Sequence, residues 1–255
     1  MTIPSSMTTS ARVYRTDVEN DVGRTIEAIF NRSAESVETR LENFPKYVRR
    51  QHLKRFLAMY EIFKRVLPLK GSVIECGVFH GFGLMSWAKL STILEPENLT
   101  RRIYGFDTFA GFPSVSRNDS SDFTRSHIGD LNSPSFDELQ ALIAEYDRDR
   151  FLGNIPKVEL VKGDIAATAP LFVESHPHLL VSLLFIDCDL FEPTVAALKA
   201  FVPRMPKGAI IAFDELDNPL WPGETLAALD GLGIGNLRLQ RLEWDPYIAF
   251  AEIGT

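Results

Sequence analysis

The fold is decided by the stretch Val181-Ser-Leu-Leu-Phe-Ile-Asp-Cys-Asp189, in which an apolar run ends abruptly in two aspartates. The run has the length and the β-rich composition of a buried strand. A strand that is buried on both faces has no place for a carboxylate until it leaves the core. We therefore expect Asp187 and Asp189 at the carboxyl edge of a sheet, where open α/β sheets bind their ligands.

A second stretch, Gly208-Ala-Ile-Ile-Ala-Phe-Asp-Glu215, repeats this design and ends in Asp214 and Glu215. If the two strands are neighbours, their carboxylates meet at one edge of the sheet and repel each other. A cation between them would relieve that repulsion. The two stretches together therefore predict a divalent-metal site in an enzyme.

Strand and helix patterns alternate along much of the chain, which indicates a parallel sheet with helices on both faces. Strands are expected at residues 72–76, 102–106, 158–161, 181–186 and 208–213, and helices at 84–94, 136–146, 166–174 and 193–201. The strand-like runs 237–243 and 247–253 are joined by a link so short that they must be antiparallel. The sequence thus predicts an α/β fold with a doubly wound, mostly parallel sheet and a C-terminal antiparallel hairpin.

The chain is expected to have three parts. Residues 1–16 are rich in Ser and Thr without periodicity and are expected to be a disordered tail. Residues 17–70 have helical periodicity and should form an N-terminal helical cap, which we expect to cover the active site and to pair with another subunit in a homo-oligomer. Residues 71–255 should form the catalytic domain. Within it, the long polar stretch 113–134 is expected to act as a lid together with Phe109 and Phe112.

The composition is typical of a soluble globular protein, with 45% hydrophobic and 24% charged residues. A net charge of −7 argues against nucleic acid as a partner. No segment has the length and apolarity needed to span a bilayer, and the polar first ten residues do not resemble a secretory leader, so we expect a cytoplasmic protein with no membrane partner. The two cysteines, Cys76 and Cys188, are expected to be small buried residues in a reducing compartment, with a neighbouring thiol pair as the alternative.

The first strand leads into a glycine-rich loop, Glu75-Cys-Gly-Val-Phe-His-Gly-Phe-Gly83, and then into a helix. Glycines in this position let a ligand approach the backbone closely. Their spacing differs from that of dinucleotide-binding loops. In addition, the Glu75 carboxylate would repel a pyrophosphate but would suit a cofactor that carries an amino group.

Two further acids follow later strands. Asp107 is placed to accept hydrogen bonds from ribose hydroxyls, and Asp164 could accept one from the amino group of an adenine. Either acid alone is as typical of a helix cap as of a ligand contact. Together with Glu75, however, they predict S-adenosylmethionine, which combines a ribose, an adenine and a positively charged amino-acid tail.

Four motifs in this order resemble the macrocin O-methyltransferase (TylF-type) family. They are Glu75-Cys-Gly-Val-Phe-His-Gly81, Gly105-Phe-Asp-Thr-Phe-Ala-Gly-Phe-Pro113, Phe185-Ile-Asp-Cys-Asp-Leu-Phe-Glu-Pro-Thr194 and Phe213-Asp-Glu-Leu216. The resemblance runs from about residue 71 to residue 213. It implies a Rossmann-like class I methyltransferase that uses S-adenosylmethionine to methylate deoxysugars of antibiotics. The acceptor in such enzymes is a nucleotide-linked sugar such as TDP-rhamnose, or a finished glycoside.

The resemblance also implies roles for individual residues. Mg²⁺ would be held by Asp187, Asp214 and Glu215. Cofactor contacts would come from Glu75, Gly77, Asp107 and Asp164, and from Gly81, Thr108 and Gly163 in the same loops. Relatives often carry Asp or Asn where this chain has Glu215, so the ion would sit differently, or Asp189 would replace one ligand.

The attacking sugar hydroxyl must lose a proton, and the expected catalytic bases are Asp187 and Asp189. His80 and His127 are alternative bases, although lone loop histidines are more often incidental. Arg117 and Arg125 are candidates for contact with a substrate diphosphate, although solvated arginines are more common in such loops.

Two other enzyme classes fit the same residues. The glycine loop is also similar to that of catechol O-methyltransferases, so the acceptor could be a phenol. A metal-dependent hydrolase could use the acidic edge to activate water, but it would give Glu75 no role.

Overall fold

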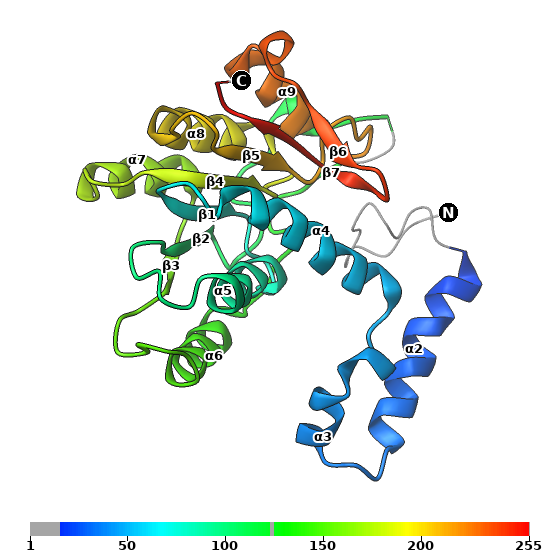
Figure 1. Cartoon of the computed structure of the whole chain (residues 1–255). Coiled ribbons are helices and arrows are strands. Elements are labelled where there is room, and N and C mark those ends of the chain that lie inside the picture. The colour runs from blue at the N-terminus through cyan, green and yellow to red at the C-terminus, as the bar shows by residue number, and fades with distance from the viewer. Residues whose placement is uncertain (1–15, 123–124, 255) are drawn as a thin grey trace. The chain divides into compact units, whose positions relative to one another are not determined.

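The computed structural model describes residues 16–122 and 125–254 (Figure 1). The chain divides into two compact units, Met1–Leu57 and Ala58–Thr255. Of the expected tail, residues 1–16, only Thr16 lies within the described part. No helix in that part is long and apolar enough to cross a membrane.

The first unit is helical, in agreement with the periodicity of its sequence. It contains α2 (Asp17–Arg32), α3 (Val37–Glu42), the 3-10 helix η1 (Phe44–Lys46) and the beginning of α4 (Arg50–Val66). α2 begins at a capping box, in which Thr16 Oγ1 accepts from the Glu19 amide at 3.2 Å and the Glu19 carboxylate accepts from the Thr16 amide at 3.0 Å. These two bonds satisfy donors that the first helical turn would otherwise leave without a partner.

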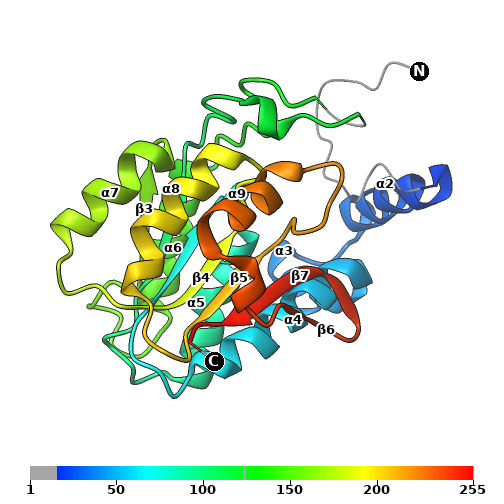
Figure 2. The ribbon, with the colours of Figure 1, turned by 90° about the horizontal axis from the view of Figure 1, so that it is seen from above.

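The second unit is built around a seven-stranded sheet with the order β3-β2-β1-β4-β5-β7-β6. The strands are β1 (Ser72–Cys76), β2 (Ile103–Asp107), β3 (Val158–Lys162), β4 (Val181–Ile186), β5 (Ile210–Phe213), β6 (Gln240–Leu242) and β7 (Asp245–Glu252). β1 to β5 are parallel, whereas β7 is antiparallel to both β5 and β6. The predicted sheet and its C-terminal hairpin are confirmed, and the hairpin extends the sheet beyond β5 (Figure 2).

Helices cover both faces of the sheet (Figure 1). α5 (Phe82–Leu94) and α6 (Phe136–Arg148) lie on one face with the end of α4, and α7 (Ile165–Ser175), α8 (Phe191–Phe201) and α9 (Pro222–Leu232) lie on the other. The short 3-10 helices are η2 (Arg117–Asp119), η3 (Val202–Arg204) and η4 (Ile234–Asn236). The sequence analysis does not predict α9, whose buried face is made mainly of small residues such as Gly223, Ala227 and Ala228.

The central strands are buried on both faces, because alternate side chains point to opposite helical layers. Ile74 and Leu184 join the core that contains α7, α8 and α9. On the other face, the Trp87 ring lies 6.3 Å from the ring of Phe63 and 5.6 Å from that of Phe185. All six residues of β4 are buried, as its apolar run predicts.

The second unit takes in the last half of α4 and therefore begins before the boundary expected at residue 70. Five side chains of this half are buried in the unit: Ala58, Met59, Ile62, Phe63 and Val66. A buried arginine fixes the end of the helix, because Arg101 donates to the carbonyls of Val66, Leu69 and Gly71, each at 2.9 Å. Its charge is balanced by Glu95 at 2.7 Å.

Candidate active site

The carboxyl ends of the parallel strands meet at one edge of the sheet, where the ladder of hydrogen bonds continues beyond the strands. The Asp187 amide donates to the Cys76 carbonyl at 2.8 Å, and the Asp214 amide donates to the Ile186 carbonyl at 3.0 Å. The backbone after β4 therefore lies beside that after β1 and that after β5. The strand order reverses between β1 and β4, which is the position where open α/β sheets form a ligand crevice.

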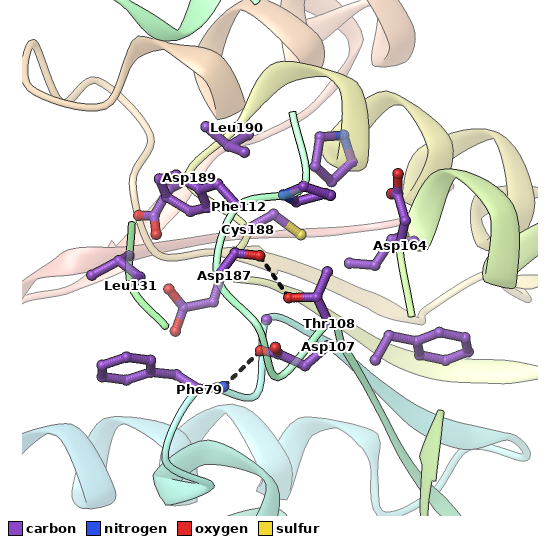
Figure 3. A pocket seen from close by; sticks show the side chains of 16 residues that line it. Phe79, Asp107, Thr108, Phe112, Leu131, Asp164, Asp187, Cys188, Asp189 and Leu190 are labelled. Carbon is purple, nitrogen blue, oxygen red and sulfur yellow. Dashed lines mark hydrogen bonds between the residues drawn. The ribbon is translucent and has the colours of Figure 1, made fainter. Parts of the chain in front are cut away.

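A pocket with about 530 Å³ of empty space, including its open mouth, lies at this edge (Figure 3). Six predicted site residues line it: Gly77, Asp107, Thr108, Asp164, Asp187 and Asp189. Apolar side chains form much of the rest, including Phe79, Phe106, Phe112, Leu131, Ile165 and Leu190. The other predicted site residues lie outside the lining: Glu75, Gly81, Gly163, Asp214 and Glu215.

The glycine loop is shaped by close approaches within the protein. Gly77 has a φ of +94°, and a Cβ added there would lie 1.8 Å from the Asp187 carbonyl oxygen. A Cβ on Gly83 would lie 2.5 Å from the carboxylate of Glu75, which is 1% exposed. Gly81, with a φ of +84°, precedes the first residue of α5. Glu75 therefore packs beneath the first turn of α5, and its contact with a cofactor stays a prediction.

Asp107 is joined to the glycine loop by hydrogen bonds. Its Oδ2 accepts from the amides of Val78 and Phe79, both at 2.8 Å, and its Oδ1 accepts from the amide of Phe109 at 2.6 Å. The neighbouring Thr108 hydroxyl donates to the Gly111 carbonyl at 2.6 Å. The Asp107 carboxylate thus orders two loops of the pocket wall, in addition to any contact that it makes with a ligand.

Asp164 follows β3 on the opposite side of the pocket from Asp187 and Asp189 (Figure 3). Its Oδ1 accepts from the Ala166 amide at 2.9 Å and so caps α7. Gly163 supports this turn, because its φ of +141° is rarely adopted by other residues. The cap and the ligand contact considered for Asp164 are compatible, since one carboxylate oxygen can cap the helix while the other faces the pocket.

The acids after β4 and β5 are close enough to influence one another. Burial raises the pKa of Asp189 well above its ordinary value, and Glu215 and Asp187 raise it further. The pKa of Glu224, in the first turn of α9, is also raised, first by burial and then by Asp187 and Glu215. Bringing a cation among these carboxylates would lower the pKa values again.

The expected metal ligands are not gathered around one point. Within residues 16–122 and 125–254, no three His, Cys, Asp or Glu side chains are grouped closely enough to hold a metal ion. Glu215 is 7% exposed, and its Oε2 accepts a hydrogen bond from the side chain of Asn218. The ligand set Asp187, Asp214 and Glu215 therefore shares an edge of the sheet but remains a prediction.

Comparison with known proteins identifies the family. The sequence model described as Macrocin-O-methyltransferase (TylF) matches residues 46–225. The chain belongs to the macrocin O-methyltransferase (TylF) family. The resemblance found in the four sequence motifs is thereby confirmed.

Several proteins described as methyltransferases are similar to this chain. The crystal structure of CalS11, described as a calicheamicin methyltransferase, matches with a TM-score of 0.90 and 32% identity over 100% of both chains. An apo structure of CalS11, described as a TDP-rhamnose 3'-O-methyltransferase, matches with a TM-score of 0.83 and 32% identity over 95% of this chain and 97% of that one. A tetracenomycin-C rhamnosyl 4'-O-methyltransferase from Streptomyces olivaceus is 24% identical over 146 residues, which cover 57% of this chain and 52% of that relative.

Two buried acids that shape the site of this macrocin O-methyltransferase family member are not predicted from the sequence. Glu224 accepts hydrogen bonds from backbone amides after both β4 and β5. Asp119 in η2 accepts from the Phe191 amide at 2.6 Å and thus caps α8 from a distant part of the chain. One weak signal for this helix is present in the sequence, because Pro222 precedes Glu224 by two residues and proline is over-represented at the first position of a helix.

The polar stretch expected to act as a lid is packed against the rim of the pocket. Phe112 joins Leu190, Leu220 and Trp221 in a small apolar cluster, and its ring lies 6.0 Å from that of Trp221. Phe109 is also buried, and its ring meets that of Phe136 edge-on. Residues 123 and 124 lie outside the described part. Lid movement stays a prediction.

The alternative catalytic bases and the candidate diphosphate contacts lie away from the pocket. His80 Nδ1 lies 2.9 Å from the Ser133 hydroxyl, and His127 is exposed beside Asp130. Arg117 and Arg125 are exposed, and none of these four candidates lines the pocket.

The two cysteines, Cys76 and Cys188, are free, buried and in contact, with Cys188 Sγ 3.4 Å from the Cys76 carbonyl. The hydrogen bond with the Cys76 thiol and burial raise the pKa of Cys188, which disfavours the reactive thiolate.

Proposed function

We propose that the protein is an S-adenosylmethionine- and Mg²⁺-dependent O-methyltransferase that methylates a hydroxyl of a deoxysugar in antibiotic biosynthesis. The acceptor would be a nucleotide-linked sugar such as TDP-rhamnose or the sugar of a glycosylated natural product. The observation that carries this proposal is the pocket at the carboxyl edge, where Asp187 and Asp189 lie beside a glycine loop. The full-length similarity to CalS11 supports the choice of a sugar acceptor.

The pocket has the chemistry needed for S-adenosylmethionine. Asp164 and Ile165 would receive the adenine, Asp107 the ribose, and the loop at Gly77 the amino-acid tail, with Glu75 held beneath it. The cofactor supplies an electrophilic methyl group. In Figure 3, Asp187 and Asp189 lie across the pocket from Asp164, so an acceptor hydroxyl would bind on their side.

The acids at the ends of β4 and β5 provide the hard oxygen ligands that Mg²⁺ prefers. We assign Asp187, Asp214 and Glu215 as ligands. Asp189 would replace Glu215 as a ligand if the hydrogen bond from Asn218 holds the Glu215 carboxylate away from the ion. A bound Mg²⁺ lowers the pKa of a coordinated hydroxyl. Asp187 or Asp189 would take the proton as general base, because both line the pocket.

The proposal also includes a cytoplasmic homo-oligomer. The first unit exposes large apolar side chains, for example Val18, Ile29, Val37 and Leu41, which a second subunit could cover. Light scattering during size-exclusion chromatography tests this part independently of activity.

Methyl transfer to a panel of acceptors tests the function. TDP-deoxysugars, free glycosides and catechols would be incubated with S-adenosylmethionine and Mg²⁺, and the products measured by mass spectrometry. We expect methylation of a deoxysugar, loss of turnover in Asp187→Asn, and nearly unchanged binding of S-adenosylhomocysteine by that variant. Methylation of catechols alone would favour the phenol alternative, and hydrolysis without S-adenosylmethionine would favour the hydrolase.

A further inference from the structure

One carboxylate joins the two loops that carry the expected metal ligands. Glu224 is 0% exposed, and its Oε1 accepts hydrogen bonds from the amides of Cys188 at 2.8 Å and Asp189 at 3.0 Å. Its Oε2 accepts from the amide of Glu215 at 3.2 Å. The first two amides belong to the loop after β4 and the third to the loop after β5. The Glu224 carboxylate therefore links the two loops beyond the backbone bond between the Asp214 amide and the Ile186 carbonyl at their start.

The backbone around Glu224 leaves little freedom for another arrangement. A Cβ on Gly223 would lie 2.6 Å from the Phe191 amide nitrogen and 2.8 Å from the Asp189 carbonyl oxygen, so the loop after β4 is pressed against the first turn of α9. Asp189 itself has a φ of +61°. Such a left-handed conformation is unfavourable for a non-glycine residue and persists only where neighbouring contacts hold it. The two hydrogen bonds to Glu224 Oε1 are contacts of this kind.

On the basis of the proposed metal-dependent methyl transfer, we propose that Glu224 is a positioning residue for the cation site. It sets the distance between Asp187 on one loop and Asp214 and Glu215 on the other. Groups that orient metal ligands commonly change metal affinity about 10–100-fold when they are replaced. Glu224 acts on the ligands through backbone amides and is not itself assigned as a ligand.

Two substitutions separate this role from a general electrostatic effect. Glu224→Gln keeps the length of the side chain, but its amide nitrogen cannot accept a hydrogen bond, so one loop is released. It also removes a negative charge, which alone would weaken cation binding. Glu224→Asp keeps the charge and is one methylene shorter, so it cannot reach both loops. Asp230→Asn, at an exposed position on the same helix, is the control for a lost charge.

The experiment measures Mn²⁺ affinity in the presence of saturating S-adenosylhomocysteine, from the electron paramagnetic resonance signal of free Mn²⁺. We expect Glu224→Asp and Glu224→Gln to weaken Mn²⁺ binding about 10-fold or more. S-adenosylhomocysteine affinity, measured by calorimetry, should stay within about threefold of wild type, a difference of under 1 kcal/mol. Asp230→Asn should bind Mn²⁺ as the wild type does. A loss of Mn²⁺ affinity without a loss of S-adenosylhomocysteine affinity would not arise from general unfolding, which weakens the binding of both ligands.

The outcomes are distinguishable. If the wild type binds Mn²⁺ and folded Glu224→Asp binds it equally well, the positioning role is wrong while the proposed function stands. If Glu224→Gln alone loses affinity, the effect is electrostatic and the positioning role is again wrong. If the wild type itself binds no Mn²⁺, the metal-dependent part of the proposed function fails, and the role of Glu224 fails with it.

Discussion

Replacing Asp107 by Asn separates two roles that one carboxylate can have, that of a loop anchor and that of a ribose contact. In the structure, Asp107 accepts hydrogen bonds from the amides of Val78, Phe79 and Phe109 at 2.6–2.8 Å. In Asn, one of the two oxygen acceptors becomes a donor, so at least one amide loses its partner. A hydrogen bond to a charged group contributes about 1.5–3 kcal/mol. We therefore expect the ligand-free protein to lose roughly 2–3 kcal/mol of unfolding free energy.

For a chain of this size, that loss corresponds to a fall in Tm of roughly 4–12 °C. The assay is thermal unfolding followed by circular dichroism without ligand, with S-adenosylhomocysteine affinity measured in parallel. Asp164→Asn is the matched control, because Asp164 also lines the pocket but accepts one amide as a helix cap, and Asn caps helices as well as Asp does. Its Tm should stay within about 2 °C of wild type. An Asp107→Asn variant that melts with the wild type but binds S-adenosylhomocysteine weakly would refute the anchoring role.

Two further predictions concern stability. Arg101→Met should destabilise the second unit by about 3–5 kcal/mol in urea unfolding, because it breaks a largely buried ion pair and leaves Glu95 without its counter-charge. Arg148→Met breaks an exposed pair with Glu145 and should cost less than about 0.5 kcal/mol. Equal costs for the two variants would contradict the role of Arg101. Burial lowers the pKa of Lys157 to about 8 in the folded protein, whereas a lysine in the unfolded chain has a pKa of roughly 10.4. Between these two pH values the unfolded chain binds more protons than the folded protein, so the free energy of unfolding should rise with pH. Lys157→Met should remove this part of the rise in urea midpoint between about pH 7 and pH 10, and an unchanged pH dependence would show that Lys157 is not responsible.

The sequence predicted the sheet and the acidic edge because both follow from local patterns. The apolar runs of β4 and β5 have strand length, and each ends in carboxylates. The carboxyl ends of parallel strands meet at one edge, so the positions of Asp187 and Asp214 follow from the strand order. Most strand and helix boundaries were also close to those observed.

The parts that sequence could not predict depend on contacts between distant segments. Glu224 bonds to amides 36 and 35 residues earlier, and Asp119 bonds to one 72 residues later. Nothing in the spacing of either acid indicates such a partner. α9 was missed for a related reason, since its buried small residues do not form the large apolar stripe that identifies an amphipathic helix.

The roles of the predicted cofactor acids illustrate another limit. An Asp or Glu residue looks the same in the sequence whether its carboxylate binds a ligand or accepts hydrogen bonds from the backbone. From the sequence, Glu75 is expected to contact the ligand, and Asp107 to contact a ribose or to cap a helix. In the structure Glu75 packs against Gly83, and Asp107 orders the glycine loop. Only tertiary structure shows which amides each oxygen reaches.

The central claim is that the edge between β1, β4 and β5 holds a methyl donor beside a cation bound by clustered acids. A crystal structure with S-adenosylhomocysteine and Mn²⁺, in which anomalous scattering locates the metal, tests it most directly. We predict the nucleoside between Asp107 and Asp164, and one anomalous peak contacted by Asp187 and Asp214. A nucleoside bound outside this pocket, or Mn²⁺ bound away from both aspartates, would contradict the claim.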